Sequence, residues 1–413
     1  MTKPNLGILV KPVSHDCNMS CGYCYYRPVS RLYPDDPRPR MALETVKAVC
    51  AQYRALGPRE FKIGWQGGEP TLLGLEFFEQ VVQIERRHAS CGDRVGNSLQ
   101  TNGLALDDDW CRFLAANCFL VGLSVDGPPD ANAVRRLRDG RPAFEPAMRA
   151  IGLLKKHQVE FNILTVVSSA NVEHPREVFQ FLLDNDLHYA QLIPCTEPGE
   201  QPGSLSEHSV SASQYADFMI ALFDAWIEND DPSYYVRCID NWLHQFFGLT
   251  PESCEYRGDC SNLITIEHNG DVYPCDFFVD REHRLGNVRE LTLEQMLRGA
   301  TFRAFVQETR AARSACRACR WFAYCHGGCH RHRGRLGMPE GAPYLCEASQ
   351  RIFSHVFRTL REVKERPVRP RLHAFMNSIE SQIAAGLLDA RGERTDAPAA
   401  RARAESPRNG PCP

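Results

Sequence analysis

The sequence lacks the features that would place the protein in a membrane or on nucleic acid. No apolar run approaches the ~18 residues that a membrane-spanning helix needs, and the N-terminus lacks the basic-then-apolar layout of a signal peptide. An excess of charge is missing too, since 48 lysines and arginines face 51 aspartates and glutamates, for a net charge of −3. We therefore expect a cytoplasmic protein whose main partner is neither nucleic acid nor an anionic membrane.

Cysteine, in contrast, is abundant, with 18 in 413 residues. Such a number is typical either of a secreted disulfide-rich protein or of a metal protein in a reducing compartment. Because there is no signal peptide and most of the cysteines are bunched at close spacings, the second class is favoured. The others are scattered, and most of them are interpreted as small buried hydrophobes: Cys50, Cys91, Cys111, Cys118, Cys195, Cys238 and Cys412.

The first cysteine group has a C-x3-C-x2-C spacing and follows an apolar, strand-like run at residues 6–13. It consists of Cys17, Cys21 and Cys24. A cubane iron–sulfur cluster takes four ligands, normally thiolates, so this loop would leave one iron open. An open coordination position is typical of a reactive metal centre rather than a structural one. Three buried cysteines, or part of a zinc site, are the alternatives.

Short apolar runs alternate with amphipathic helical patterns from residue 7 to about 230. Six strand–helix units in series favour a parallel sheet covered by helices, either an open doubly wound sheet or a partial barrel. The predicted strands are 7–14, 60–66, 95–101, 119–125, 160–167 and 188–193. The predicted helices are 43–56, 75–88, 107–116, 144–157, 174–185 and 212–228.

Glycine and polar residues follow these strands at the ends where α/β barrels carry their chemistry. Strand two leads into Gln66-Gly67-Gly68-Glu69, strand three into Gln100-Thr101-Asn102, and strand four into Ser124-Val125-Asp126. Glycine allows the backbone to approach a ligand closely. Polar residues at the same end of several strands therefore indicate a shared site.

A second cysteine group lies between residues 254 and 346. Its first part includes a predicted hairpin of residues 264–267 and 272–273, turned at Asn269-Gly270, which is a strong hairpin signal. By number and spacing, two all-thiolate zinc sites fit these cysteines as well as two iron–sulfur clusters do. The group consists of Cys254, Cys260, Cys275, Cys316, Cys319, Cys325, Cys329 and Cys346.

The first cysteine loop, with its aromatic residue Tyr23, resembles the signature of the radical S-adenosylmethionine (SAM) enzymes. The resemblance implies an α/β fold with a TIM-like partial (β/α)6 barrel, and a 4Fe–4S cluster on the three cysteines whose fourth iron is bound by SAM. The SAM-binding residues that it implies are Tyr23, Gly67, Gly68, Glu69, Ser124, Asp126 and Arg135. Charge-assisted pairing with the SAM carboxylate suits Arg135, but it could also be one of several solvated arginines between residues 135 and 138.

The second cysteine group resembles a SPASM domain, a small cysteine-rich module with a β-hairpin and helices that binds two auxiliary 4Fe–4S clusters. The chain would then hold three clusters. The resemblance implies that the first auxiliary cluster is held by Cys254, Cys260, Cys275 and Cys329, and the second by Cys316, Cys319, Cys325 and Cys346. Full thiolate ligation implies that these clusters carry electrons rather than bind substrate.

Five segments together resemble the anaerobic sulfatase-maturating enzymes: 66–71, 100–103, 269–278, 285–287 and 319–329. That family oxidises a sulfatase cysteine or serine to Cα-formylglycine. A 5′-deoxyadenosyl radical takes a Cβ hydrogen, a base takes the thiol or hydroxyl proton, and the auxiliary clusters take the remaining electron. Asp276 matches the proposed base, while Gln66 and Tyr26 match residues of the substrate pocket. The implied partners are an unfolded sulfatase polypeptide and a flavodoxin- or ferredoxin-type reductant.

Two other hypotheses remain open from the sequence. One is another SPASM-type peptide maturase, which forms thioethers or matures a peptide-derived cofactor, and the other is a non-enzymatic zinc or electron-carrier protein. The expected domains are a radical SAM partial barrel at 1–235, a SPASM domain at 236–347 and C-terminal helices at 348–387. A disordered tail is expected at 388–413, where composition turns to alanine, arginine, glutamate and proline.

Overall fold

The computed structural model describes residues 6–57, 61–89, 95–199, 201, 204–333 and 343–388. The tail predicted to be disordered, apart from its first residue, lies outside these residues, as do Cys91 and Cys412. None of the helices in the described ranges combines the length and apolar character needed to cross a membrane.

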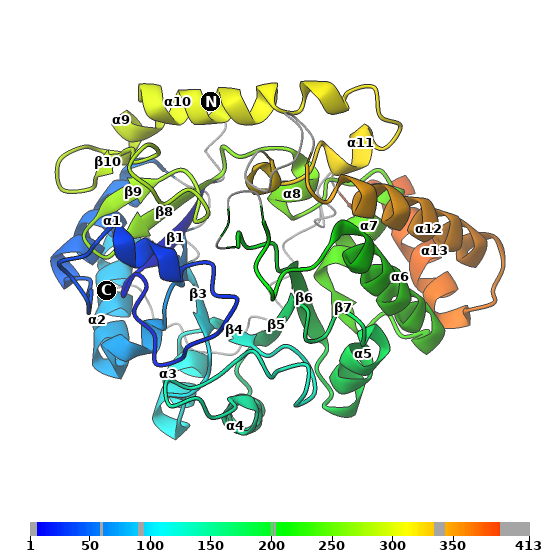
Figure 1. The fold of residues 1–413 in the computed structure, drawn as a ribbon, viewed down its shortest axis with the longest axis horizontal. Helices are drawn as coiled ribbons and strands as arrows, with labels where there is room; N and C mark the ends of the chain where they lie inside the picture. Colours follow the sequence, from blue (N-terminus) through cyan, green and yellow to red (C-terminus); the bar gives the residue numbers. More distant parts are fainter. Residues whose placement is uncertain are drawn as a thin grey trace.

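The first part of the chain is a parallel sheet with helices around it, so the predicted α/β class is confirmed (Figure 1). Strands β1 to β6 lie side by side in chain order and are all parallel. Their bounds are β1 Gly7–Lys11, β2 Phe61–Trp65, β3 Val95–Thr101, β4 Leu120–Ser124, β5 Phe161–Val167 and β6 Tyr189–Pro194. The helices between and after them are α1 Leu43–Ala55, α2 Leu75–His88, α3 Asp108–Ala116, α4 Phe144–Lys156, α5 Pro175–Asp184 and α6 Ala212–Asn229.

Strand β1 is the element whose end differs most from the sequence prediction. It ends at Lys11 rather than at residue 14. Pro12 has no N–H to donate to a neighbouring strand, and Ser14 has a left-handed φ of 48°. The chain therefore leaves the sheet early and turns into the cysteine loop.

The sheet extends beyond the six predicted strands at both edges. The predicted hairpin is present as β8 (Leu263–Glu267) and β9 (Asp271–Tyr273), turned at Gly270 with a φ of 90°. Strand β8 pairs in parallel with β1, and Lys11 lies opposite Glu267. The full order is β10-β9-β8-β1-β2-β3-β4-β5-β6-β7, with β10 at Gly286–Asn287 and β7 at Tyr235–Val236.

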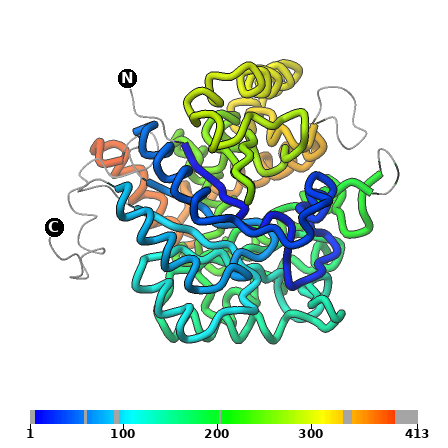
Figure 2. Tube along the Cα trace, turned by 90° about the vertical axis from the view of Figure 1, so that its left-hand side faces the viewer, coloured from blue at the N-terminus to red at the C-terminus, as the bar shows by residue number. Residues whose placement is uncertain are grey.

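The remaining helices follow β7: in Figure 1, α9 and α10 lie near β10, whereas α12 and α13 lie beside α6 and α7. Figure 2 shows the segment from about residue 260 to 330 at the top of the view; its strands β8 to β10 extend the sheet beyond β1. Helix α12 packs along α6, and it buries an apolar stripe of Ile352, Phe353, Val356, Phe357 and Leu360. These helices are α7 Arg237–Phe246, α8 Cys254–Arg257, α9 Leu293–Leu297, α10 Ala300–Ala311, α11 Phe322–Cys325, α12 Cys346–Glu365 and α13 Pro370–Ala384. Short 3-10 turns occur both before and after β7: η1 Arg27–Arg31, η2 Pro70–Leu73, η3 Ser314–Cys316 and η4 His330–His332. The domain limits expected from the sequence, at residues 235, 347 and 387, stay predictions.

Candidate active site

The two glycines after β2 pack directly against the start of the cysteine loop. Gly68 has a φ of 49°, and a Cβ at this position would lie 1.9 Å from the carbonyl oxygen of Asp16. The next residue, Glu69, donates its backbone N–H to that same oxygen at 2.8 Å. Gly67 also has a positive φ, of 93°. Glycine is therefore required here for a close approach between two backbones, and this contact positions the cysteine loop over the sheet.

Glu69 is buried and joins the ends of β2 and β3. Its Oε1 accepts hydrogen bonds from the backbone and hydroxyl of Thr71 and from the hydroxyl of Thr101, at 3.2, 2.6 and 2.7 Å. Its Oε2 accepts from the backbone N–H of Asn102 at 2.7 Å. Burial raises the pKa of Glu69, while these hydrogen bonds lower it. The side chain of Asn102 lies 3.7 Å from the Cys17 sulfur, so Glu69 also connects to the first cysteine.

Tyr23, Asp126 and Arg135 form one buried polar group. The Tyr23 hydroxyl donates to Asp126, and Arg135 donates to the Tyr23 hydroxyl at 2.8 Å. Burial raises the pKa of Asp126, and the positive charge of Arg135 opposes that rise. Arg136 next in sequence is exposed, so Arg135 is not one of the solvated arginines of this run. Ser124 is half-buried at the end of β4.

The cysteine side chains gather in the three groups that the family resemblance implies. Cys17 lies near enough to Cys21 and Cys24 for their charges to interact, and burial raises its pKa to about 12. Cys275 interacts in the same way with Cys329 and Cys254. The remaining interactions complete the two four-cysteine sets: Cys329 with Cys254 and Cys260, and Cys325 with Cys316, Cys319 and Cys346.

These groups suit clusters better than single ions. Within the described ranges, no three histidine, cysteine, aspartate or glutamate side chains surround a point where one metal ion would fit. A tetrahedral zinc site requires four ligands around one ion, with Zn–S distances of about 2.3 Å. A cubane attaches each cysteine to a different iron, so its ligands can lie further apart.

Asp276 directly follows Cys275, a member of the first four-cysteine set, and lines a cavity of about 450 Å³. Its Oδ2 accepts a hydrogen bond from the Tyr25 hydroxyl at 2.9 Å and lies 3.7 Å from the ammonium of Lys11. Gln66 donates to the same Tyr25 hydroxyl at 3.4 Å. The structure thus brings two of the expected residues, Asp276 and Gln66, around Tyr25.

Lys11 is a site residue that the sequence reasoning missed. It is fully buried at the end of β1, and burial lowers its pKa, while the carboxylates of Asp276 and Glu267 oppose this shift. The ammonium also lies 4.4 Å from the centre of the Tyr26 ring. A signal was present, because Lys11 is the charged residue in the apolar run at 6–13. A buried charge requires partners, so this run predicts an acidic neighbour.

Tyr26, which was also expected at the substrate pocket, lies next to Tyr25 in the chain, and its place in that pocket stays a prediction. Its hydroxyl donates to Glu267 on β8, and its side chain is buried. Its neighbour Tyr25 lines the cavity beside Asp276, with the two rings 5.5 Å apart.

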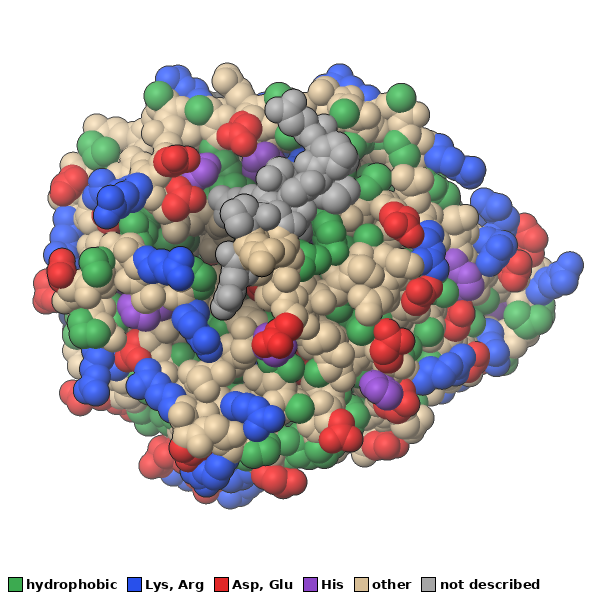
Figure 3. Space-filling view, in the orientation of Figure 1, with side chains coloured by type: hydrophobic (Ala, Val, Ile, Leu, Met, Phe, Trp, Pro, Cys, Tyr) green, Lys and Arg blue, Asp and Glu red, His purple; other side chains and the backbone are tan. Residues whose placement is uncertain are grey.

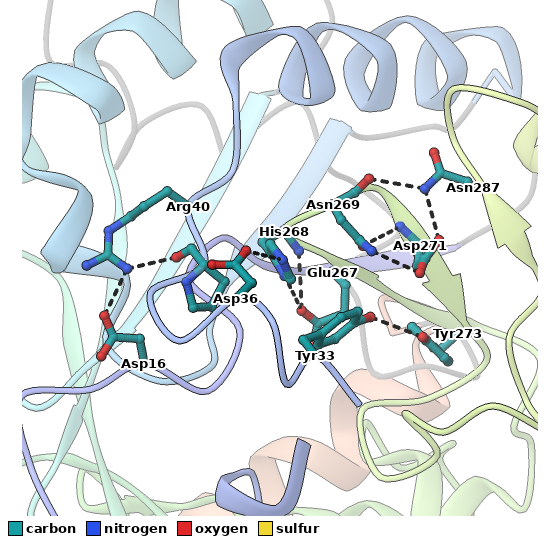
Figure 4. Close-up of polar contacts among 11 residues, drawn as sticks. Asp16, Tyr33, Asp36, Arg40, Glu267, His268, Asn269, Asp271, Tyr273 and Asn287 are labelled. Carbon is teal, nitrogen blue, oxygen red and sulfur yellow. Dashed lines mark hydrogen bonds and ion pairs between the residues drawn. The ribbon is translucent and has the colours of Figure 1, made fainter. Parts of the chain in front are cut away.

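A polar network joins the segment after the cysteine loop to the β8–β9 hairpin (Figure 4). His268 lies between Glu267 and Asp36, with nitrogen–oxygen distances of 3.1 and 3.2 Å. The hydroxyls of Tyr33 and Tyr273 are 3.1 Å apart. Because β9 leads directly to Cys275 and Asp276, these contacts hold the base candidate in register with the first cysteine loop.

Comparison with known proteins first gives the class. A model of the radical SAM superfamily matches residues 12–182, and a model of SPASM, an iron–sulfur cluster-binding domain, matches residues 258–320. The fold and the cysteine groups therefore define a radical SAM enzyme with a SPASM domain.

Individual relatives give the family. The chain is 33% identical over 365 residues to the cysteine-type anaerobic sulfatase-maturating enzyme of Clostridium perfringens, over 87% of this chain and 98% of that protein. The serine-type enzyme of Bacteroides thetaiotaomicron is also 33% identical, over 371 residues, 85% of this chain and 89% of that protein. The chain belongs to the anaerobic sulfatase-maturating enzymes, which confirms the resemblance and excludes the non-enzymatic hypothesis.

Solved structures agree with this assignment. The structure described as native anSMEcpe with bound AdoMet and Cp18Cys peptide has a TM-score of 0.80 and 33% identity, over 87% of this chain and 99% of that one. Streptococcus suis SuiB bound to the precursor peptide SuiA has a TM-score of 0.59 at 15% identity, over 84% of this chain and 76% of that one, and shares the fold.

Proposed function

We propose that this enzyme oxidises a cysteine or serine of an unfolded sulfatase polypeptide to Cα-formylglycine, with a flavodoxin- or ferredoxin-type protein as reductant. The observation that carries the proposal is the position of Asp276. Its carboxylate lies on a cavity wall, held by Tyr25 from the first cysteine loop, while its neighbour Cys275 belongs to an auxiliary cysteine set. A base for the substrate proton and the cysteines for two kinds of cluster therefore meet at one place.

The cysteine groups fit three 4Fe–4S clusters, one on the loop of Cys17, Cys21 and Cys24 and two on the four-cysteine sets. The residues proposed to hold SAM are Tyr23, Gly67, Gly68, Glu69, Ser124, Asp126 and Arg135. When bound, SAM and the first cluster would supply a 5′-deoxyadenosyl radical that removes a Cβ hydrogen, and the auxiliary clusters would take the remaining electron.

Asp276 accepts the thiol or hydroxyl proton of the target residue at its carboxylate. The Tyr25 hydroxyl fixes the orientation of that carboxylate, and Gln66 fixes the hydroxyl in turn. The neighbouring Tyr26 is held in turn by a hydrogen bond to Glu267, and both side chains are buried. These contacts hold the proposed base in a fixed orientation, and catalysis by proximity and orientation requires this.

The cavity is suited to an extended peptide. Its lining contains both Arg31 and Arg331 and the carboxylates of Glu197 and Asp280. A volume of about 450 Å³ admits a few side chains, not a folded domain. The target residue therefore has to reach Asp276 before its sulfatase folds.

Peptide oxidation under anaerobic conditions tests the proposal. A peptide with a Cys-x-Pro-x-Arg core should exchange sulfur for oxygen and lose two hydrogens, and its serine version should lose two hydrogens alone, as seen by mass spectrometry. D276N should still cleave SAM but form no aldehyde, whereas D280N, an equivalent change on the same cavity, should retain the product. Full turnover by D276N would refute the assignment of the base. SAM cleavage without a mass change in either peptide would favour another type of peptide maturase.

A further inference from the structure

Helix α10 and the segment after it are rich in arginine. Residues 300–320 contain five arginines and one acidic residue, Glu308, in a chain whose net charge is −3. Glu308 is already engaged, because its carboxylate lies 3.1 Å from His330. The segment itself is therefore strongly basic, and the nearby carboxylate of Asp259 interacts with the charge of Arg310.

Four of these arginines are exposed, and we call them the arginine face: Arg303, Arg310, Arg317 and Arg320. Arg303 and Arg310 are seven residues apart, so they share one side of α10, away from its buried residues at 302, 305 and 309. Among the described residues, none of the four has a salt-bridge partner. In Figure 3, which has the orientation of Figure 1, lysines and arginines are interspersed with acidic side chains over the face toward the viewer.

The arginine face adjoins the second auxiliary cysteine set. Arg317 and Arg320 each directly follow a cysteine of that set, Cys316 and Cys319, and both cysteines are partly exposed. The fifth arginine of the segment, Arg313, is buried, and its guanidinium lies 3.5 Å from the Cys260 sulfur of the other set. A protein bound to this face would therefore lie close to redox centres.

We propose that the arginine face docks an acidic one-electron carrier protein of the flavodoxin or ferredoxin class. The inference rests on the proposed function, because the cysteine sets exchange electrons only when they hold clusters. Opposite charge steers such encounters and aligns the partners, and a transient redox contact requires only a small interface. Exposed arginines beside partly exposed cysteines meet both requirements.

Binding measurements separate this docking from the chemistry. R303Q/R310Q/R317Q removes three charges from the arginine face, and R86Q/R87Q/R112Q removes three from α2 and α3 as the matched control. The probe is a purified, fluorescently labelled acidic flavodoxin, titrated with anaerobically reconstituted enzyme. At about 20 mM salt the first variant should bind about tenfold more weakly than wild type, while the control binds equally. At about 500 mM salt wild-type binding should weaken to the level of the variant.

Equal affinity of all three proteins, an equal loss in both variants, or no binding by wild type would overturn the proposal. So would displacement of flavodoxin by an equimolar DNA duplex. If R303Q/R310Q/R317Q loads less iron, R303Q/R310Q avoids the residues beside cysteines and should bind about fivefold more weakly. Peptide oxidation driven by dithionite is measured in parallel. Its failure in wild type counts against the proposed function, whereas the binding result alone decides the docking site.

Discussion

Glu85 is a buried carboxylate whose ionisation should destabilise the fold above neutral pH. It lies on α2 and is fully buried. Its Oε2 accepts a hydrogen bond from Asn97 at 2.7 Å, and Asn97 in turn accepts one from the Trp65 indole at 2.7 Å. The other oxygen, Oε1, has no partner in the described part of the protein. Burial raises the pKa of Glu85 from 4.5 to about 7, against the lowering effect of Asn97.

The sign of the pH dependence follows from these values. The unfolded chain releases this proton near pH 4.5 and the folded chain near pH 7, so between them the folded state binds more protons. The free energy of unfolding therefore falls as pH rises through this window, by about 3 kcal/mol in all. Between pH 5.5 and 8.5 the loss is about 2 kcal/mol, since part of it has already occurred at pH 5.5.

E85Q keeps the shape of the side chain and removes the charge, so it should avoid this loss. Relative to wild type, E85Q should gain about 2 kcal/mol more at pH 8.5 than at pH 5.5. For 413 residues this corresponds to about 2 °C in Tm. Anaerobic differential scanning fluorimetry of both proteins at the two pH values measures it, and E79Q, an exposed position on the same helix, is the matched control. An identical Tm difference between E85Q and wild type at both pH values would refute the reasoning.

Three further predictions concern the clusters and SAM. Y23F removes the hydroxyl between a buried carboxylate and a buried guanidinium; it should weaken SAM binding at least severalfold in equilibrium dialysis, and unchanged affinity would contradict the proposed role. C17S should lose about four of about twelve irons per chain on reconstitution, and loss of all iron or of none would be inconsistent with independent clusters. R333M removes a guanidinium 3.4 Å from the Cys316 sulfur; it should lower the reduction potential of one auxiliary cluster by tens of millivolts in an EPR-monitored titration, while R333K retains part of the original value.

Local patterns in the sequence predicted most of the fold because they depend on neighbouring residues. The six strands and six helices of the barrel follow from hydrophobic periodicity, and Asn269-Gly270 marks the hairpin. The pairing of that hairpin with β1 could not be predicted in this way. It joins residues about 250 positions apart, and no local feature of either strand identifies its partner.

In the candidate site, too, local features could be predicted from the sequence, whereas contacts between distant residues could not. The cysteine groups and the run Gly67-Gly68-Glu69 are recognisable in the sequence, but the neighbours of Asp276 are not. Lys11 could have been marked as a buried charge, yet its partner lies 265 residues further along the chain. In the run at residues 135–138, only tertiary burial distinguishes Arg135 from the exposed Arg136.

The extension of the sheet explains how Asp276, the proposed base, comes to lie beside the first cysteine loop although it is far from it in sequence. Strand β8 lies beside β1, the strand that leads into the first cysteine loop. Glu267 at the end of β8 accepts from Tyr26 in that loop, and the chain then turns through β9 to Asp276, which accepts from Tyr25. Tyr25 and Tyr26 thus connect the first cysteine loop by hydrogen bonds to both ends of the β8–β9 hairpin. Because backbone pairing sets this register, the position of Asp276 relative to the loop of Cys17, Cys21 and Cys24 is determined by the sheet.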